Sequence, residues 1–63
     1  MKIEQIAELI EEEIKPKKQF FSANDVRRAF HELSEGKIIN ALIMLKRQQK
    51  IIKWSNKNWR WIK

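Results

Sequence analysis

The sequence has 63 residues, no cysteine, 43% hydrophobic residues and a formal net charge of +6. A chain of this length has room for one small core, so we expect a single domain over residues 1–63, marginally stable unless it dimerises or packs well. The lack of cysteine excludes disulfide bonds and thiolate metal sites, and no apolar run approaches the ~20 residues that cross a bilayer. The acidic first segment is unlike a secretory signal, so we expect a cytoplasmic protein without membrane contact.

The charge is distributed unevenly along the chain. Residues 1–13 hold one lysine and five glutamates, a net charge of −4, whereas residues 14–63 hold 13 basic and three acidic residues, a net charge of +10. A positive field over most of the chain favours a polyanionic partner. A lysine-rich surface that only interacts with solvent is the alternative interpretation.

The first expected element is an amphipathic helix that ends near Lys15, because Pro16 disfavours helical geometry in the residue before it. Apolar residues at three- and four-residue steps define its buried stripe: Ile3, Ile6, Ala7, Ile10 and Ile14. After a short basic connector, Phe20 and Phe21 predict a minimal edge strand.

The second expected helix begins at Ser22 as N-cap, with Asp25 near the positive end of the helix dipole. Its predicted buried stripe is Val26, Ala29, Phe30 and Leu33. Arg27, Arg28 and His31 fall on the other side of the wheel. His31 is the only histidine, so we expect a surface residue and no metal site.

A third helix is expected over about residues 35–49, capped by Ser34. Its predicted buried face holds Ile38, Leu42, Leu45 and Gln49, flanked by Ile39 and Ala41, and its predicted exposed face holds Gly36, Lys37, Asn40, Met44, Arg47 and Gln48. This exposed face has the chemistry of a major-groove reader, because cations contact phosphate or guanine and asparagine pairs with adenine. Ordinary solvent exposure explains the same polar residues.

Ile43 and Met44 add more apolar surface than one small core needs. Three roles fit them: contact with thymine methyl groups, contact with a partner subunit, or contact with the C-terminal hairpin.

The chain ends in an expected β-hairpin in which Trp54 pairs with Trp59 across a loop at residues 55–58. In that register one face holds Ile52, Trp54, Trp59 and Trp61, and the other holds Ile51, Lys53, Arg60 and Ile62. We expect the tryptophan face to be core, because aromatic burial gives the larger hydrophobic gain. Stacking of single-stranded bases on a tryptophan is the second interpretation.

The segment "EGKIINALIMLKRQQKIIKWSNKNWRWIK" resembles the recognition helix, strand, wing and aromatic final strand of the winged helix-turn-helix superfamily. The resemblance extends over nearly the whole chain, in the order helix, short strand, helix, helix, strand, wing and strand. It implies an α+β fold. Many members turn through a glycine before the second strand, whereas this chain has "RQQKI", so the turn near Gln49 needs another solution.

The resemblance implies a protein that binds double-stranded DNA, either sequence-specifically or generally, as a small transcriptional regulator. The third helix would enter the major groove through Gly36, Lys37, Asn40, Met44 and Arg47. Arg27 or Arg28 would brace the DNA backbone, Ser34 would contact phosphate at a helix start, and Asn56 and Lys57 would reach the flanking backbone or minor groove. Specific regulation suggests a homodimer on a two-fold site, with the first helix as a contact surface.

The alternative function is a protein-interaction module of a replication or transcription assembly, docking through Ile39, Ile43 and Met44 or through the tryptophan hairpin. We do not expect an enzyme or a cofactor. The sequence has one glycine, one histidine and no cysteine, and it offers neither an activated nucleophile nor a phosphate-binding loop.

Overall fold

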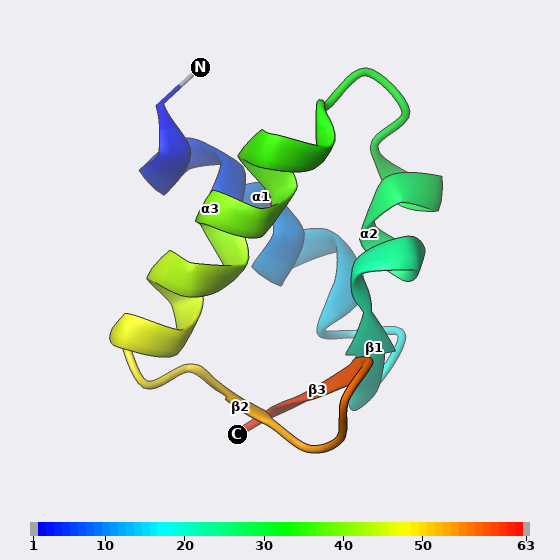
Figure 1. Cartoon of the computed structure of the whole chain (residues 1–63), viewed down its shortest axis with the longest axis vertical. Helices are drawn as coiled ribbons and strands as arrows, with labels where there is room; N and C mark the ends of the chain where they lie inside the picture. Colours follow the sequence, from blue (N-terminus) through cyan, green and yellow to red (C-terminus); the bar gives the residue numbers. More distant parts are fainter. Residues whose placement is uncertain (1, 63) are drawn as a thin grey trace.

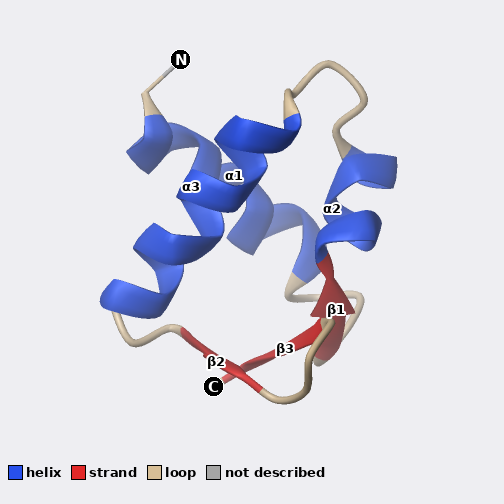
Figure 2. Ribbon diagram, viewed as in Figure 1, coloured by secondary structure: helices blue, strands red, loops and turns tan. Residues whose placement is uncertain are grey.

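The computed structural model describes residues 2–62 and contains three helices and three short strands in that range (Figure 1). The elements are α1 (Ile3–Ile14), β1 (Phe20–Ser22), α2 (Ala23–Ala29), α3 (Glu35–Arg47), β2 (Ile51–Lys53) and β3 (Asn58–Trp61). The strands form one antiparallel sheet at one end of the molecule, with the helices packed together on one side of it (Figure 2). The fold is α+β, as predicted.

The core forms where α1, α3 and the inner face of the sheet meet. The predicted stripe of α1 is buried at Ile6, Ala7, Ile10 and Ile14, and Ile3 packs at its edge. The helix ends with Lys15 as its C-cap, as expected from Pro16. The other buried members of the core are Phe21, Val26, Ile38, Ala41, Leu42, Leu45, Ile51 and Trp61. Each large side chain contributes roughly 1.5–3 kcal/mol through burial, which offsets the conformational entropy of a short chain.

Serine caps start both α2 and α3, as predicted. The Ser22 hydroxyl oxygen accepts a hydrogen bond from the Asp25 backbone N–H at 3.3 Å, and the Ser22 N–H donates to the Asp25 carboxylate at 2.9 Å. The Ser34 hydroxyl oxygen accepts from the Lys37 N–H at 3.4 Å. These bonds satisfy N–H groups that a helix start leaves without partners.

The predicted stripe of α2 is partly wrong, because Ala29 is exposed. The helix is only seven residues long and ends at Ala29. Phe30 and Leu33 therefore reach the core from the following loop, where both are half-buried against it.

The third helix ends at Arg47, two residues before the predicted end. Gln49 was predicted on the buried face, but it lies in the turn after the helix with a φ of 60° and is exposed. Ile39 is exposed rather than flanking the core, and Met44 is half-buried against the core rather than fully exposed.

The hairpin register differs by one residue from the prediction. The sheet order is β1-β3-β2, and Trp59 pairs with Lys53 rather than with Trp54. A one-residue shift exchanges the two faces of a strand. Ile51 therefore lies opposite Trp61 in the core, whereas Ile52 and Trp54 are exposed.

Contacts at both ends of the hairpin account for this register. At the start of β2, the Lys50 N–H donates to the carbonyl oxygen of Leu45, which turns the chain so that Ile51 enters the core directly. At the tip, Trp54 and Ser55 both donate N–H groups to the carbonyl oxygen of Asn58. The connecting loop is thus residues 54–57, and Asn58 is the first residue of β3, half-buried rather than a free tip residue.

Candidate nucleic-acid interface

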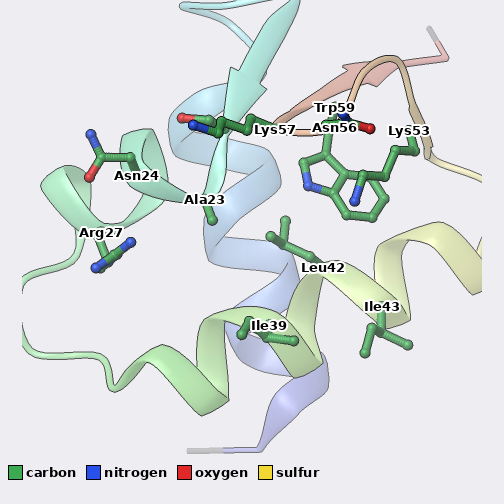
Figure 3. Close-up of a pocket in the computed structure, with 11 residues that line it drawn as sticks. Ala23, Asn24, Arg27, Ile39, Leu42, Ile43, Lys53, Asn56, Lys57 and Trp59 are labelled. Carbon is green, nitrogen blue, oxygen red and sulfur yellow. The ribbon is translucent and has the colours of Figure 1, made fainter.

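A groove of about 440 Å³ runs between α2, α3 and the β2–β3 hairpin (Figure 3). The N-terminal end of α2 contributes Ser22, Ala23, Asn24 and Arg27; α3 contributes Ile39, Leu42 and Ile43; the hairpin contributes Lys53, Asn56, Lys57 and Trp59. In Figure 3, Asn24 and Arg27 lie on the α2 side of the groove, and Lys53 and Trp59 lie on the hairpin side. Segments distant in the sequence thus meet at one concave surface.

The floor of the groove is apolar because of the way α3 packs. Ile38, Leu42 and Leu45 face α1 and the core, and all three are buried. At 3.6 residues per turn, Ile39 and Ile43 then lie one turn apart on the flank of α3 beside α2 and the hairpin. They are 46% and 43% exposed, so they present two aliphatic side chains to whatever occupies the groove.

The α2 side of the groove is anchored by the capping hydrogen bonds between Ser22 and Asp25. The Ser22 N–H and the neighbouring Lys18 ammonium hold the pKa of the Asp25 carboxyl below its usual value, although partial burial opposes the shift. The carboxylate is therefore ionised at neutral pH and is engaged by the cap and by Lys18. Arg27 at the rim lies 3.8 Å from Glu35, and since both side chains are exposed, this pair contributes little.

The hairpin side carries two cations. The Lys53 ammonium lies 5.3 Å from the centroid of the Trp59 ring, within the range of a cation–π interaction. Lys57 is exposed in the tip loop. Within that tip, the Asn58 amide donates to the Ser55 hydroxyl at 3.1 Å, which ties the two ends of the loop together.

Several ion pairs involve glutamates of α1 and lysines near that helix. Glu11 contacts both Lys15 and Lys50, at 3.7 and 2.9 Å, and Glu13 contacts Lys17. By contrast, Lys53 and Lys57 form no ion pair within residues 2–62. Residues 36–62 hold seven basic residues and no acidic one. The hairpin and its side of the groove therefore carry positive charge that no ion pair compensates within residues 2–62, and this charge attracts anions.

Three of the predicted site residues line the groove: Arg27, Asn56 and Lys57. Six others are exposed outside it, namely Arg28, Ser34, Gly36, Lys37, Asn40 and Arg47. Met44 is half-buried against the core. A Cβ added at Gly36 would meet no atom within 4 Å, so internal packing does not require a glycine there.

The groove residues that were not predicted as DNA-binding residues from the sequence include Asn24, Lys53 and Trp59. Lys53 and Trp59 were placed on opposite faces by the wrong register, and the correct pairing puts them side by side. Ile43 was predicted as surplus apolar surface, and Ile39 and Ile43 as docking residues of the alternative function, but the sequence does not indicate that both line a groove with the hairpin. Their one-turn spacing next to a buried Leu42 was the available signal.

No protein-family model matches the chain, and neither a curated protein nor a solved structure shows significant similarity to it. Within residues 2–62, no three histidine or acidic side chains gather closely enough to hold a metal ion. None of the helices in that range combines the length and the apolar character needed to cross a membrane. The groove combines an apolar floor with a cationic rim.

Proposed function

We propose that this chain is a winged-helix protein that binds double-stranded DNA and acts as a small transcriptional regulator. The observation that carries the proposal is the groove between α2, α3 and the hairpin. Its rim holds Arg27, which has only an exposed pairing with Glu35, and Lys53 and Lys57, which form no ion pair within residues 2–62. Cations that no carboxylate neutralises are the chemical requirement for phosphate contacts.

The length and exposure of α3 suit insertion into a major groove. A 13-residue helix is about 20 Å long, and the major groove of B-DNA, about 12 Å wide, admits one helix. The outward side of α3 presents Asn40 and Arg47, side chains that read adenine and guanine or hold phosphate. Ile39 and Ile43, on the flank beside the hairpin, fit thymine methyl groups.

The elements that flank α3 would contact the DNA backbone. Arg27 lies on the α2 side of the groove and Lys53 on the hairpin side, so that a duplex docked on α3 has a cation at either edge. The tip loop, residues 54–57, projects from the sheet and would follow the flanking backbone or minor groove (Figure 1). Phosphate contacts of this kind position the reading helix and make the affinity depend on salt.

A protein-interaction module is the second candidate, and the apolar floor of the groove favours it. Two exposed isoleucines beside Trp59 would receive an apolar side chain from a partner as readily as a thymine methyl group. In that case Ile43→Glu would abolish association with the partner and leave the fold intact.

The deciding experiment is fluorescence anisotropy of a labelled random-sequence duplex, titrated at several salt concentrations. Lys53→Ala and Lys57→Ala should each weaken binding and reduce the slope of log affinity against log salt by about 0.9 for each lost phosphate contact. Lys17→Ala is the matched control, because it removes the same charge from the connector, where Lys17 already pairs with Glu13. Parent-like binding and slope in both groove variants would refute the proposed interface.

A further inference from the structure

The sheet has a second face, opposite to the core, that carries large apolar side chains in solvent. Across its three strands, Phe20, Arg60 and Ile52 lie in one row, because β3 is the central strand and Arg60 pairs with both neighbours. Trp54 follows on the same face two residues after Ile52. In Figure 2 the helices lie on the other side of the sheet, and none of them crosses this face.

An aromatic pair dominates this outer face. The rings of Phe20 and Trp54 meet edge to face, with their centroids 4.8 Å apart and an interplanar angle of 60°. Trp54 is 60% exposed, the highest value among the large hydrophobic residues within residues 2–62, and Phe20 is 45% exposed. The mutual contact fixes the orientation of both rings while each keeps accessible surface. An exposed, oriented aromatic pair is a characteristic of binding surfaces.

The outer face is separate from the groove. Trp59 and Lys53 pair with each other and line the groove, whereas their neighbours Arg60 and Ile52 point to the opposite side. The hairpin therefore has two binding faces of different character. A ligand of the outer face makes its contacts without displacing one bound in the groove.

The charge of the outer face selects the kind of ligand. Arg60 lies in the middle of the row, forms no ion pair within residues 2–62, and belongs to a hairpin without acidic residues. A second copy of the chain docking on this face would bring two Arg60 side chains together and oppose two chains of net charge +6. The ligand must therefore carry negative charge for Arg60 and flat apolar groups for the two rings. A single-stranded nucleic acid has both, because its bases stack on rings and its phosphates bind guanidinium.

We propose that the outer face binds single-stranded DNA, with unpaired bases stacked on Trp54 and Phe20 and a phosphate held by Arg60. DNA is the ligand proposed because rings, an aliphatic side chain and a guanidinium bind bases and phosphate, and none of these contacts requires a 2′-hydroxyl. The inference goes beyond the proposed duplex binding and uses other residues.

The test is anisotropy of a labelled oligo(dT), about ten nucleotides long, against the full chain at low and moderate salt. Trp54→Leu keeps an apolar side chain but removes the ring, so it should weaken oligo(dT) binding roughly 5- to 100-fold. Trp54→Phe keeps a ring and should bind within a few-fold of the parent. Leu9→Ala is the control for an apolar truncation elsewhere, since Leu9 lies on the acidic side of α1.

Intrinsic fluorescence gives an independent readout of the same contact. Trp61 is buried, and Trp59 is half-buried and lines the groove on the other face, so stacking on the outer face should quench mainly the exposed Trp54. Trp54→Phe should therefore bind oligo(dT) and lose most of the quenching. Circular dichroism checks that each variant is folded, which is expected because Trp54 is largely outside the core.

Three results would overturn the inference: no oligo(dT) binding by the parent at low salt, parent-like binding by Trp54→Leu, or a parent dimer in sedimentation that Trp54→Leu dissociates. Duplex titrations of the same variants keep the two proposals apart. Lost oligo(dT) binding with retained duplex binding confirms the role of Trp54, whereas absence of duplex binding with retained oligo(dT) binding refutes only the groove proposal.

Discussion

In the turn after α3, Gln49 takes the place that glycine usually occupies at the end of a helix. Gln49 adopts a φ of 60°, its N–H donates to the carbonyl oxygen of Lys46, and the Lys50 N–H donates to that of Leu45. This pair of bonds is the Schellman motif, in which glycine is the usual left-handed residue. A side chain in that conformation costs roughly 1–2 kcal/mol, since its Cβ crowds the following carbonyl.

Gln49→Gly should therefore stabilise the protein. Relief of the left-handed conformation gains roughly 1–2 kcal/mol, and the greater freedom of glycine in the unfolded chain takes back about 0.4–1 kcal/mol, which leaves a net gain of about 0.5–1 kcal/mol. Urea unfolding followed by circular dichroism measures it. Gln48→Gly is the control, because Gln48 has a φ of −77° and should lose stability. A destabilised Gln49→Gly would contradict the role assigned to this turn.

Asp25 links stability to pH through the cap of α2. Its folded-state pKa lies below the ordinary value of 3.8, chiefly because the Ser22 N–H donates to the carboxylate. A depressed pKa stabilises the fold above pH 3.8, and this contribution is lost as the pH falls through the lower folded-state value. Asp25→Asn should lower the stability at pH 7 by about 0.5–1 kcal/mol and by less near pH 2. Unfolding curves at both pH values test this, and an equal loss at both would contradict it.

For the elements, the sequence predicted the positions of helices and strands along the chain more accurately than the register of the hairpin. Helix starts at Ser22 and Ser34 and the end near Pro16 follow from local chemistry, because a cap or a proline acts on its own neighbours. The strand register depends on contacts far along the chain. Trp61 stacks on Phe21 with centroids 5.0 Å apart, and the turn at Lys50 delivers Ile51 to the core. Neither contact can be inferred from alternation alone.

From the observed register we expect truncation of two adjacent isoleucines to cost different amounts of stability. Ile51→Ala should cost about 2–5 kcal/mol, because Ile51 is buried opposite Trp61 and its truncation leaves a cavity. Ile52→Ala, made on the same strand but on the exposed face, should cost less than about 1.5 kcal/mol. Thermal unfolding of the two variants side by side provides the measurement. The opposite order would indicate the register in which Trp54 pairs with Trp59.

The candidate site was predictable only in part, because the packing of α3 against its neighbours decides which of its residues line the groove. Composition located the positive charge, and the helical wheel found the exposed side of α3. The wheel does not state which flank of that helix faces α2 and the hairpin, because this depends on how α3 crosses α1. Lys37 and Lys53 look alike in the sequence, yet only Lys53 lines the groove. Packing between elements, and not local pattern, made that distinction.

At the scale of the molecule, the acidic and basic parts of the sequence remain distinct in space. Glu11 of α1 pairs with Lys15 and Lys50, whereas the hairpin cations Lys53, Lys57 and Arg60 form no ion pair within residues 2–62. An acidic helix repels a polyanion, so binding from the α1 side is disfavoured. The molecule is 26 Å long and 22 Å in its other two dimensions, so a nucleic acid approaching the hairpin meets both of its faces within a short distance.

A duplex with a single-stranded tail should consequently bind more tightly than a blunt duplex or oligo(dT) alone. Once the groove holds the duplex part, the tail reaches the outer face as an intramolecular partner at an effective concentration near millimolar, which raises affinity roughly 10²-fold or more. Anisotropy of a labelled duplex with a tail of about ten thymidines, beside the blunt duplex, measures the gain. Trp54→Leu should bring the tailed duplex back to the affinity of the blunt one, because the ring is the principal contact of the tail. Equal affinities of the parent for tailed and blunt duplexes would show that the two faces of the hairpin do not act on one DNA molecule.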